Sequence, residues 1–353
     1  MSSTHAHRRS QSAWGALMSD LNRHYRLHLS RRSRSAAQVG MKTQHERRIV
    51  IERALLDLHC DEYELRKLKN LRSKHVRAII DKWRGRGLKA STLATNISHL
   101  RTLCRWIQKP ELTRVIDGII AAEPELTRRR VATDRDRSER GSGVELGDIL
   151  ARAFALDPRF CCQLALIAAF GLRALESWLF RPHLAEDAAG RVHILWGTKG
   201  GRPRTLPLPM TDEQRLALDW ARSFAATDAE SMIPRGWKLQ QWRRRFYRLC
   251  ARVGLTKRAT GATPHSFRHG VLLDLYKRLT GSEAPARGGD LKARDPYADE
   301  AARALVAALA GHSRLSVSSA YLGSATLSRA LPTTAVTEPA PNTVPKAEPH
   351  SDS

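Results

Sequence analysis

Apolar residues recur at helical spacing along most of this chain, and this periodicity constrains its fold more than any other feature. In the segment 76–83, for example, they occupy the first, fourth, fifth and eighth positions, which is the pattern of one buried helix face. The run 192–208 differs, because its apolar residues alternate on both sides of the glycine-containing turn 197–201. Such alternation around a turn predicts a β-hairpin. We therefore expect a mainly α fold with one small β-hairpin or sheet.

A charged segment with few apolar residues divides the chain in two. Residues 124–143 (PELTRRRVATDRDRSERGSG) end in Gly and Ser, a composition typical of an interdomain linker. A helical domain over 41–123 precedes this linker, and a mixed α+β domain over 144–330 follows it. The arginine-rich residues 1–40 predict a basic flexible arm that contains one helix. The proline-rich residues 331–353 predict a disordered tail.

The charge balance indicates a polyanionic partner. The 353 residues include 60 Lys and Arg against 35 Asp and Glu, which gives a formal net charge of +25. Arginine predominates over lysine, and its planar guanidinium binds phosphate oxygens in pairs. A genome rich in G and C would explain the preference for arginine, but it would not explain the excess of positive charge. DNA or RNA is therefore the first partner to consider.

Several classes of protein lack their sequence signatures here. No apolar run is long enough to span a membrane, and the N-terminus lacks the apolar core of a signal peptide. We therefore expect a cytoplasmic protein associated with the nucleoid. The five cysteines lie among apolar neighbours and indicate reduced core thiols. His, Cys and acidic residues show no metal-ligand spacing, and no phosphate-binding glycine loop is present, so we expect neither a metal nor a cofactor.

Four short motifs in the second domain carry residues suited to phosphodiester chemistry. Without a metal, that chemistry needs cations around the phosphate, a protein nucleophile and a proton donor for the leaving oxygen. The motif residues are Arg173 and Glu176 in GLRALES, Lys199 at the hairpin tip, His265 and Arg268 in HSFRH, and His312 and Tyr321 in GHSRLSVSSAY. Each motif is weak alone: His-x-x-Arg occurs four times in the chain, an arginine near Glu176 would ordinarily be its ion-pair partner, and a single tyrosine is more often a core residue. Their order within one domain is the informative feature.

That order resembles the catalytic domain of the tyrosine recombinases, the phage integrase family. The resemblance covers residues 144–325 and is most specific in the HSFRH and GHSRLSVSSAYL segments. The helical region 41–122 is similar to the family's N-terminal core-binding domain, with STLATNISHLRTLCRW in the place of its closing helix. The resemblance implies a two-domain recombinase architecture in which both domains hold a DNA duplex.

The resemblance also implies a role for each motif residue. Tyr321 is the expected nucleophile, which attacks a DNA phosphate and forms a 3′-phosphotyrosyl bond. The other expected roles are phosphate binding by Arg173 and Arg268, hydrogen bonding and proton transfer by His265 and His312, protonation of the departing 5′ oxygen by Lys199, and support of the site by Glu176. The covalent intermediate conserves the energy of the broken bond, so the implied strand transfer is independent of metal and ATP.

The implied activity is site-specific recombination of double-stranded DNA by a homotetramer acting on two sites. Integration and excision of a mobile element is the expected role, with accessory DNA-bending or directionality proteins as further partners. A relaxase of the type IB topoisomerase kind shares the catalytic set and is an alternative. An inactive or regulatory DNA-binding protein of the same fold is another. An RNA-binding protein is disfavoured, because no RNA-binding motif is present.

The sequence departs from the family pattern at two places. The stretch between Arg268 and His312 is longer than the resemblance leads us to expect, and residues 281–300 have the composition of an inserted loop. The hairpin also carries a single lysine, Lys199, in TKGGRPR. Arg202 or Arg204 therefore remains an alternative for part of its role.

A cluster of basic residues supports DNA binding independently of the motifs. Residues 235–258 contain nine Lys and Arg and no acidic residue. The arginines on the outer faces of the helix predicted there are Arg243, Arg244, Arg245, Arg248 and Arg252. In the first domain, the corresponding candidates are Lys74, Arg77 and Lys89. A merely solvated surface is the alternative, but no acid offsets the charge near the five arginines, so we expect these residues to contact the DNA backbone.

Overall fold

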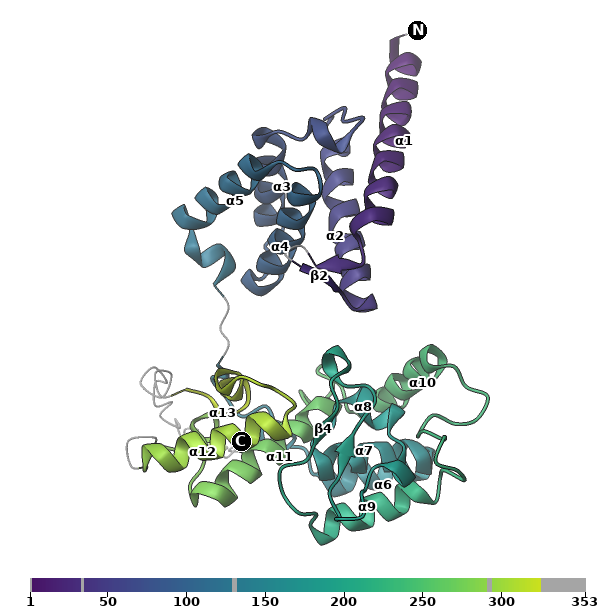
Figure 1. Ribbon diagram of the computed structural model, residues 1–353, viewed down its shortest axis with the longest axis vertical. Coiled ribbons are helices and arrows are strands. Elements are labelled where there is room, and N and C mark those ends of the chain that lie inside the picture. The colour runs from purple at the N-terminus through teal and green to yellow at the C-terminus, as the bar shows by residue number, and fades with distance from the viewer. Residues whose placement is uncertain (1, 33–34, 129–131, 291–293, 325–353) are drawn as a thin grey trace, which may run out of the picture. The chain divides into compact units, whose positions relative to one another are not determined.

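The chain folds into two units that meet in sequence near residue 130 (Figure 1). The structure is a computed structural model and describes residues 2–32, 35–128, 132–290 and 294–324. The first unit comprises Met1–Arg130 and the second Val131–Ser353. Most of the described residues are helical, and the strands are few and short, so the predicted fold class is confirmed.

The described part of the first unit is a helical bundle. Its helices are α1 (Ser2–His28), α2 (Met41–Cys60), α3 (Ser73–Gly85), α4 (Ala90–Trp106) and α5 (Pro110–Ala122), with the 3₁₀ turns η1 (Leu68–Asn70) and η2 (Pro124–Thr127). A short antiparallel strand pair, β1 (Arg31–Arg32) and β2 (Ser35–Gln38), follows α1.

Local sequence signals explain the helices of this unit. The buried residues of α3 include Val76, Ile79, Ile80 and Trp83, which lie on one face of the helix. Pro110 occupies the first turn of α5, where the missing backbone N–H breaks no helical hydrogen bond. The proline therefore separates α5 from α4, and the predicted helical character of this region is confirmed.

Helix α1 corrects the prediction of a flexible basic arm over residues 1–40. Its residues Leu17, Leu21 and Tyr25, spaced four apart, are buried in the same core as residues of α2 and α4. Asp20 also accepts a hydrogen bond from a backbone N–H of η1 at 2.8 Å. One apolar stripe therefore docks this helix on the bundle, although the segment as a whole is rich in arginine.

The second unit places helices around a small β-hairpin. Its helices are α6 (Leu146–Leu156), α7 (Pro158–Phe170), α8 (Ala174–Leu179), α9 (Asp212–Arg222), α10 (Leu239–Arg252), α11 (Pro264–Thr280), α12 (Pro296–Leu309) and α13 (Ser319–Leu322). The strands are β3 (His193–Ile194) and β4 (Arg204–Thr205), and the 3₁₀ turns are η3 (Arg140–Ser142), η4 (Pro182–Leu184), η5 (Lys199–Gly201), η6 (Pro285–Arg287) and η8 (Leu315–Ser318). The core brings together apolar residues of α6 to α13.

The hairpin is fixed against α8 by a glycine. Strands β3 and β4 pair with Ile194 opposite Arg204. Gly197 follows β3 with φ of 74°, and a Cβ at this position would lie 2.6 Å from the carbonyl oxygen of Leu175. Only glycine tolerates both the backbone conformation and the close approach. The hairpin tip is therefore held beside the helix that carries Glu176.

Residues 132–143 pack on the second unit, which corrects the linker prediction for this part of 124–143. The backbone N–H of Thr133 donates to the carbonyl of Ser319 at 2.9 Å. Asp136 forms an ion pair with Arg287 at 2.8 Å. The segment is polar, but its partners lie far along the chain, so its composition gave no indication that it is anchored.

The predicted inserted loop over 281–300 contributes folded elements. It contains η6 and the first turn of α12, and Arg287 of η6 also forms an ion pair with Asp274 at 2.6 Å. Residues 291–293 within it, and the predicted tail 331–353, lie outside the described residues. Among the residues described, no helix has the length and apolar character needed to cross a membrane.

Candidate active site

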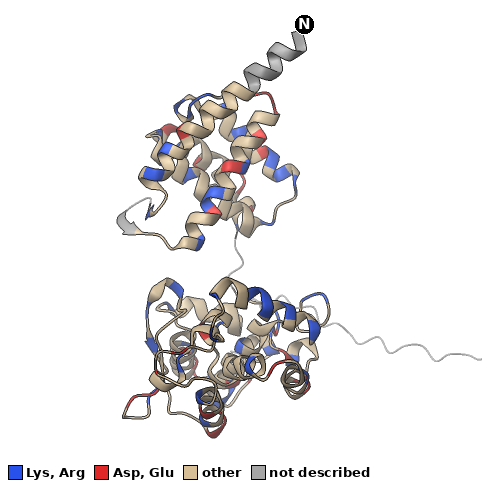
Figure 2. Cartoon of the chain, turned by 90° about the vertical axis from the view of Figure 1, so that its right-hand side faces the viewer, with Lys and Arg blue, Asp and Glu red and all other residues tan. Residues whose placement is uncertain are grey.

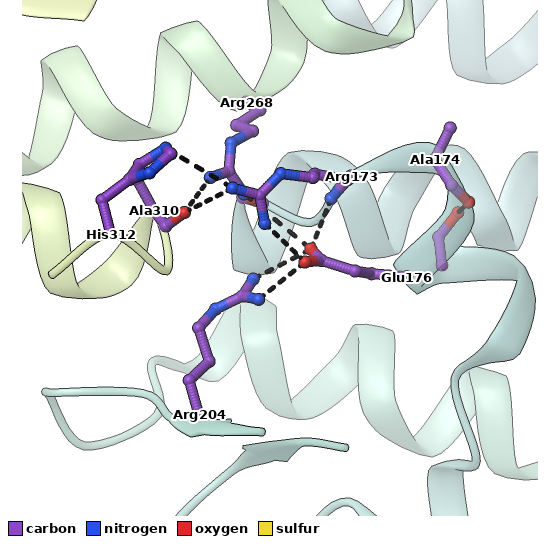
Figure 3. A network of polar contacts seen from close by, with 9 residues as sticks. Arg173, Ala174, Glu176, Arg204, Arg268, Ala310 and His312 are labelled. Carbon is purple, nitrogen blue, oxygen red and sulfur yellow. Dashed lines mark hydrogen bonds and ion pairs between the residues drawn. The ribbon is translucent and has the colours of Figure 1, made fainter. Parts of the chain in front are cut away.

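Glu176 of α8 lies at the centre of a network of guanidinium groups (Figure 3). Its carboxylate is fully buried and accepts two hydrogen bonds from Arg204, at 2.7 and 2.9 Å. It accepts two more from Arg173, one from Nη1 and one from the backbone N–H, both at 2.7 Å. Burial alone would raise the pKa of this carboxyl, but the hydrogen bonds and charges of Arg204 and then Arg173 lower it to about 2. Glu176 is therefore an anion that positions the arginines.

Arg173 and Arg268 converge on one backbone oxygen. The Nη2 atom of Arg173 donates to the carbonyl of Ala310 at 2.8 Å, and Nη2 of Arg268 donates to the same oxygen. Arg268 is completely buried, and its Nη1 donates to the carbonyl of Gly171. Ala310 caps the C-terminus of α12, where carbonyl groups carry partial negative charge. The oxygen therefore holds two like-charged groups side by side.

The network carries an excess of positive charge. Three guanidiniums, those of Arg173, Arg204 and Arg268, surround the single carboxylate of Glu176 (Figure 3). Fixed cations in a partly buried site stabilise an anion without first having to reorganise. An oxyanion such as a phosphate is therefore the ligand that this site favours.

Two histidines beside the guanidiniums are neutral at pH 7. Nε2 of His312 lies 3.5 Å from Nη2 of Arg173, and desolvation followed by the charges of Arg173 and Arg268 lowers the pKa of His312 to about 4. Although His265 is exposed at the surface, desolvation by the surrounding protein, and then the charges of Arg268 and Arg173, lower its pKa to about 4. Each neutral imidazole has one nitrogen that accepts a proton.

Tyr321 of α13 lies beside the same groups. Its residue surface is 7% exposed, and the Cζ atom of Arg268 lies 5.7 Å from the centroid of its ring. The ring centroids of His265 and His312 each lie 6.3 Å from that of Tyr321. The structure therefore brings together five of the six predicted catalytic residues within one unit.

Lys199, the sixth, lies at the rim of the site. It is exposed in η5, at the tip of the hairpin. Its charge contributes to the low pKa of His312, so it lies within electrostatic reach of the site. Arg204, one of the two alternatives for its role, is instead bound by Glu176, with a side chain only 9% exposed. Arg202 is exposed like Lys199.

Two residues of the site have roles that the sequence analysis did not predict. Arg204 positions Glu176, a role that only the folded hairpin reveals. His269 packs its ring 4.9 Å from that of Tyr321 and 5.0 Å from that of His265, measured between centroids. Burial, and then the charges of its neighbours, lowers the pKa of His269 to about 3. His269 is the last residue of HSFRH, so the motif itself contained the signal.

Known proteins and protein families have sequences related to this chain. Tyrosine recombinase XerC of Brucella melitensis biotype 1 is 27% identical over 270 residues, which cover 73% of this chain and 76% of that protein. The family model described as phage integrase, N-terminal, matches residues 18–113, and the one described as integrase matches 127–272. The chain belongs to the tyrosine recombinase (phage integrase) family.

Solved structures share the fold of this chain. A lambda integrase dimer bound to a COC′ core site superposes with a TM-score of 0.55 at 17% identity, covering 88% of this chain and 77% of that chain. A second lambda integrase dimer on the same kind of core site gives a TM-score of 0.51 at 17% identity, covering 88% of this chain and 95% of that one. At this identity the likeness concerns the fold.

The arginines of α10 that are predicted to contact DNA differ in their surroundings. Arg245 is half-buried and forms an ion pair with Asp157 at 3.1 Å. The other arginines of α10 are exposed, and within the described residues none of them has a carboxylate partner; they are Arg243, Arg244, Arg248 and Arg252. In the first unit, the exposed basic candidates are Lys74, Arg77 and Lys89. Figure 2 marks the positions of Lys and Arg along the ribbons of both units.

The described residues contain no cluster suited to a metal ion, and their cysteines are mostly buried thiols. Within the described ranges, no group of three or more His, Cys, Asp or Glu side chains is arranged to hold a metal ion. Four of the five cysteines are buried, and all five are free thiols. Burial raises the pKa of the Cys104 thiol to about 12, and a protonated thiol is a poor nucleophile.

Proposed function

We propose that this protein is a site-specific DNA recombinase that cleaves and rejoins strands through a 3′-phosphotyrosyl intermediate on Tyr321. The observation that carries the proposal is the convergence, within one unit, of two guanidiniums, two neutral imidazoles and a phenol: Arg173, Arg268, His265, His312 and Tyr321. This set supplies a nucleophile, proton acceptors and fixed positive charge for one phosphate.

In the cleavage step, Oη of Tyr321 attacks the phosphorus and the bond to O5′ breaks. The phosphate passes through a five-coordinate state with additional negative charge on its non-bridging oxygens. Arg173 and Arg268 bind those oxygens from positions that Glu176 and the Ala310 carbonyl already fix. Nε of Arg268 is buried and has no hydrogen-bond partner among the described residues, so it is available to the phosphate.

Proton transfers accompany both halves of this step. The phenolic proton of Tyr321 passes to a neutral imidazole of His312 or His265, whose low pKa values leave an acceptor nitrogen at pH 7. Lys199 donates a proton to O5′ and leaves a 5′-hydroxyl. In the reverse step, a 5′-hydroxyl of either duplex attacks the phosphorus and returns its proton to Lys199. The bond from phosphorus to Tyr321 breaks, and the phenolate regains its proton from the imidazolium. The phosphodiester energy is retained throughout, so we expect strand transfer to be independent of ATP and metal.

The partner in this proposal is double-stranded DNA, held by the exposed arginines of α10 and the basic residues of the first unit. Exchanging both strands of two duplexes requires four cleavage events, which is why we propose a homotetramer. The role we assign is integration and excision of a mobile element in a cytoplasmic, nucleoid-associated setting, with accessory DNA-bending or directionality proteins. The dimer of lambda integrase solved on a core site is consistent with this partner.

Formation of a covalent adduct tests the proposal. The full chain is incubated with nicked duplexes from a random-sequence pool, in which cleavage near the nick releases a short fragment and traps the intermediate. A denaturing gel should show a protein–DNA adduct for the wild type and none for Tyr321→Phe. The adduct should persist in EDTA. An adduct that forms equally well with Tyr321→Phe would contradict the assignment of the nucleophile.

A further inference from the structure

A basic pocket adjoins Tyr321 in the second unit and is not explained by the cleavage chemistry. It has a volume of about 530 Å³. Three stretches of chain line it: the segment 135–142, the loop 257–263 and the first two turns of α11. Arg173 and Arg268 do not line it, so the pocket is distinct from the place where those arginines would bind the scissile phosphate.

Two histidines connect this pocket to the catalytic centre. His265 and His269 both line it, and their ring centroids lie 6.3 and 4.9 Å from that of Tyr321. A DNA strand whose phosphate lies at Tyr321 therefore passes close to the pocket. Successive phosphates of one strand rise only about 3.4 Å along the duplex axis, so a neighbouring phosphate of that strand is within reach.

The lining of the pocket is positively charged. Arg135, Arg137 and Lys257 are exposed, and no carboxylate of the described residues forms an ion pair with any of them. Asp136 is the one acidic residue of the lining, and Arg287 already pairs with it at 2.8 Å. The three cations are therefore free to bind an anion.

One buried polar atom of the pocket also lacks a hydrogen-bond partner among the described residues. His269 is 6% exposed, and its Nδ1 has no hydrogen-bond partner among the described residues. Leaving such an atom buried and unpaired costs roughly 1–3 kcal/mol, which a ligand or a bound water would offset. The N-terminus of α11, with its partial positive charge, opens onto the same pocket.

We propose that this pocket binds a second phosphate of the cleaved strand, adjacent to the scissile one, through Arg135 and Arg137. The inference rests on the proposed function and assigns a DNA-contacting role to the segment 132–143. Arg287 then acts as a positioning residue, because its ion pairs with Asp136 and Asp274 hold this segment against the unit. The insertion over 281–300 thereby contributes to DNA binding without touching the DNA.

The test uses the full chain and a duplex that it selects from a random-sequence pool. Each phosphate in turn is replaced by an uncharged methylphosphonate, and affinity is measured for the wild type and for Arg135→Ala/Arg137→Ala. For the wild type, we expect one methylphosphonate next to the cleavage position to weaken binding by about tenfold or more. For the double variant, that same replacement should have almost no further effect, because the contact is already lost.

Matched variants separate this contact from general effects. Arg135→Lys/Arg137→Lys keeps both charges and should retain most of the penalty. Arg278→Ala removes an arginine about 20 Å away at the other end of α11, which does not line this pocket, and should give the wild-type pattern. Thermal unfolding of each variant checks that it is folded.

Two failures are distinguishable. If every methylphosphonate weakens the wild type and the alanine variant equally, or if the affected phosphate is remote from the cleavage position, the pocket assignment is overturned while adduct formation still supports a recombinase. If the wild type forms no Tyr321 adduct, the proposed function fails. The binding scan then still shows whether any phosphate depends on the two arginines, and the absence of such dependence overturns the pocket assignment as well.

Discussion

A buried carboxylate sets the geometry of the site at the scale of single residues. Glu176 receives hydrogen bonds from Arg173 and Arg204 and lies 3.9 Å from Arg268. Charges removed from water are tolerated only when they are paired. Glu176 is therefore required to hold these guanidiniums in position before a phosphate binds.

Replacing this carboxylate should lower the stability of the protein and also remove part of the dependence of that stability on acid pH. Glu176→Gln leaves buried guanidiniums unpaired, and we expect the free energy of unfolding in urea to fall by about 3–5 kcal/mol. Because the pKa is lowered to about 2 from 4.5, the stabilisation is present above pH 4.5 and lost as the pH falls toward 2. The variant should lack this acid-dependent loss.

Glu186→Gln is the matched control, because Glu186 also pairs with two arginines, Arg215 and Arg222. Those arginine side chains are 42% and 30% exposed, so solvent screens the pairs and we expect a loss of less than about 1 kcal/mol. Equal losses for the two variants would show that burial of Glu176 has no special consequence.

Lys199 is predicted to act as a proton donor. Lys199→Ala should slow cleavage of ordinary DNA by about 10²–10⁴-fold, because an alkoxide is a poor leaving group. A 5′-bridging phosphorothiolate needs no proton, so single-turnover adduct assays should show nearly wild-type cleavage of that substrate by the variant. Arg202→Ala, which alters the same turn, should leave both rates near wild type. A variant that stays slow on the sulfur substrate would point to phosphate stabilisation instead.

At the scale of elements, the arginines of α10 divide into two groups with different roles. Arg244 and Arg248 are exposed, whereas Arg245 is tied to Asp157 and lies 5.7 Å from the ring centroid of Trp237. We expect Arg244 and Arg248 to contact DNA phosphates and Arg245 to stabilise the fold.

Salt dependence of binding tests this division. Arg244→Ala/Arg248→Ala should weaken binding to any duplex and reduce the slope of log K against log salt by about 2, because two phosphate contacts are lost. Arg245→Ala should lower the melting temperature and change the slope little. An unchanged slope for the double variant would mean that this face of α10 does not meet DNA.

Local periodicity explains how much of these elements could be predicted. The helices of both units and the hairpin follow from spacing within each segment, and the order of the motif residues indicated which ones meet. The features that could not be predicted are ion pairs between residues far apart in sequence. Arg204 pairs with Glu176, and Asp136 pairs with Arg287. The docking of α1 was missed for another reason: the spacing of Leu17, Leu21 and Tyr25 indicated a helix, but the abundant arginines favoured a flexible arm over a packed one.

At the scale of the whole molecule, the structure favours cleavage by a subunit's own tyrosine. The segment carrying Tyr321 is tied into its own unit: Thr133 donates to the carbonyl of Ser319 at 2.9 Å, and Arg303 to that of Gly323 at 3.1 Å. The nucleophile therefore lies beside arginines of the same chain.

Mixing two inactive variants tests this arrangement. Tyr321→Phe lacks the nucleophile and Arg173→Ala lacks a phosphate-binding group, so a mixture should form no adduct above the level of either alone. A mixture of wild type and Tyr321→Phe should still form adduct on the same gel. If the two inactive variants restore cleavage together, Tyr321 acts in a neighbouring subunit's site.

Arg173 and Arg268 are anchored by one oxygen, which belongs to the main chain at Ala310. A side-chain substitution at this position therefore cannot remove their shared hydrogen-bond acceptor. No codon change at position 310 deletes a carbonyl, and alanine scanning would pass over it without effect. What can displace it is a change in where α12 stops, which Gly311 marks with φ of 65°. Inserting one residue within that helix would turn its last carbonyl by about 100°. Substitutions in α12 therefore leave this anchor in place, whereas an insertion or deletion within the helix displaces it.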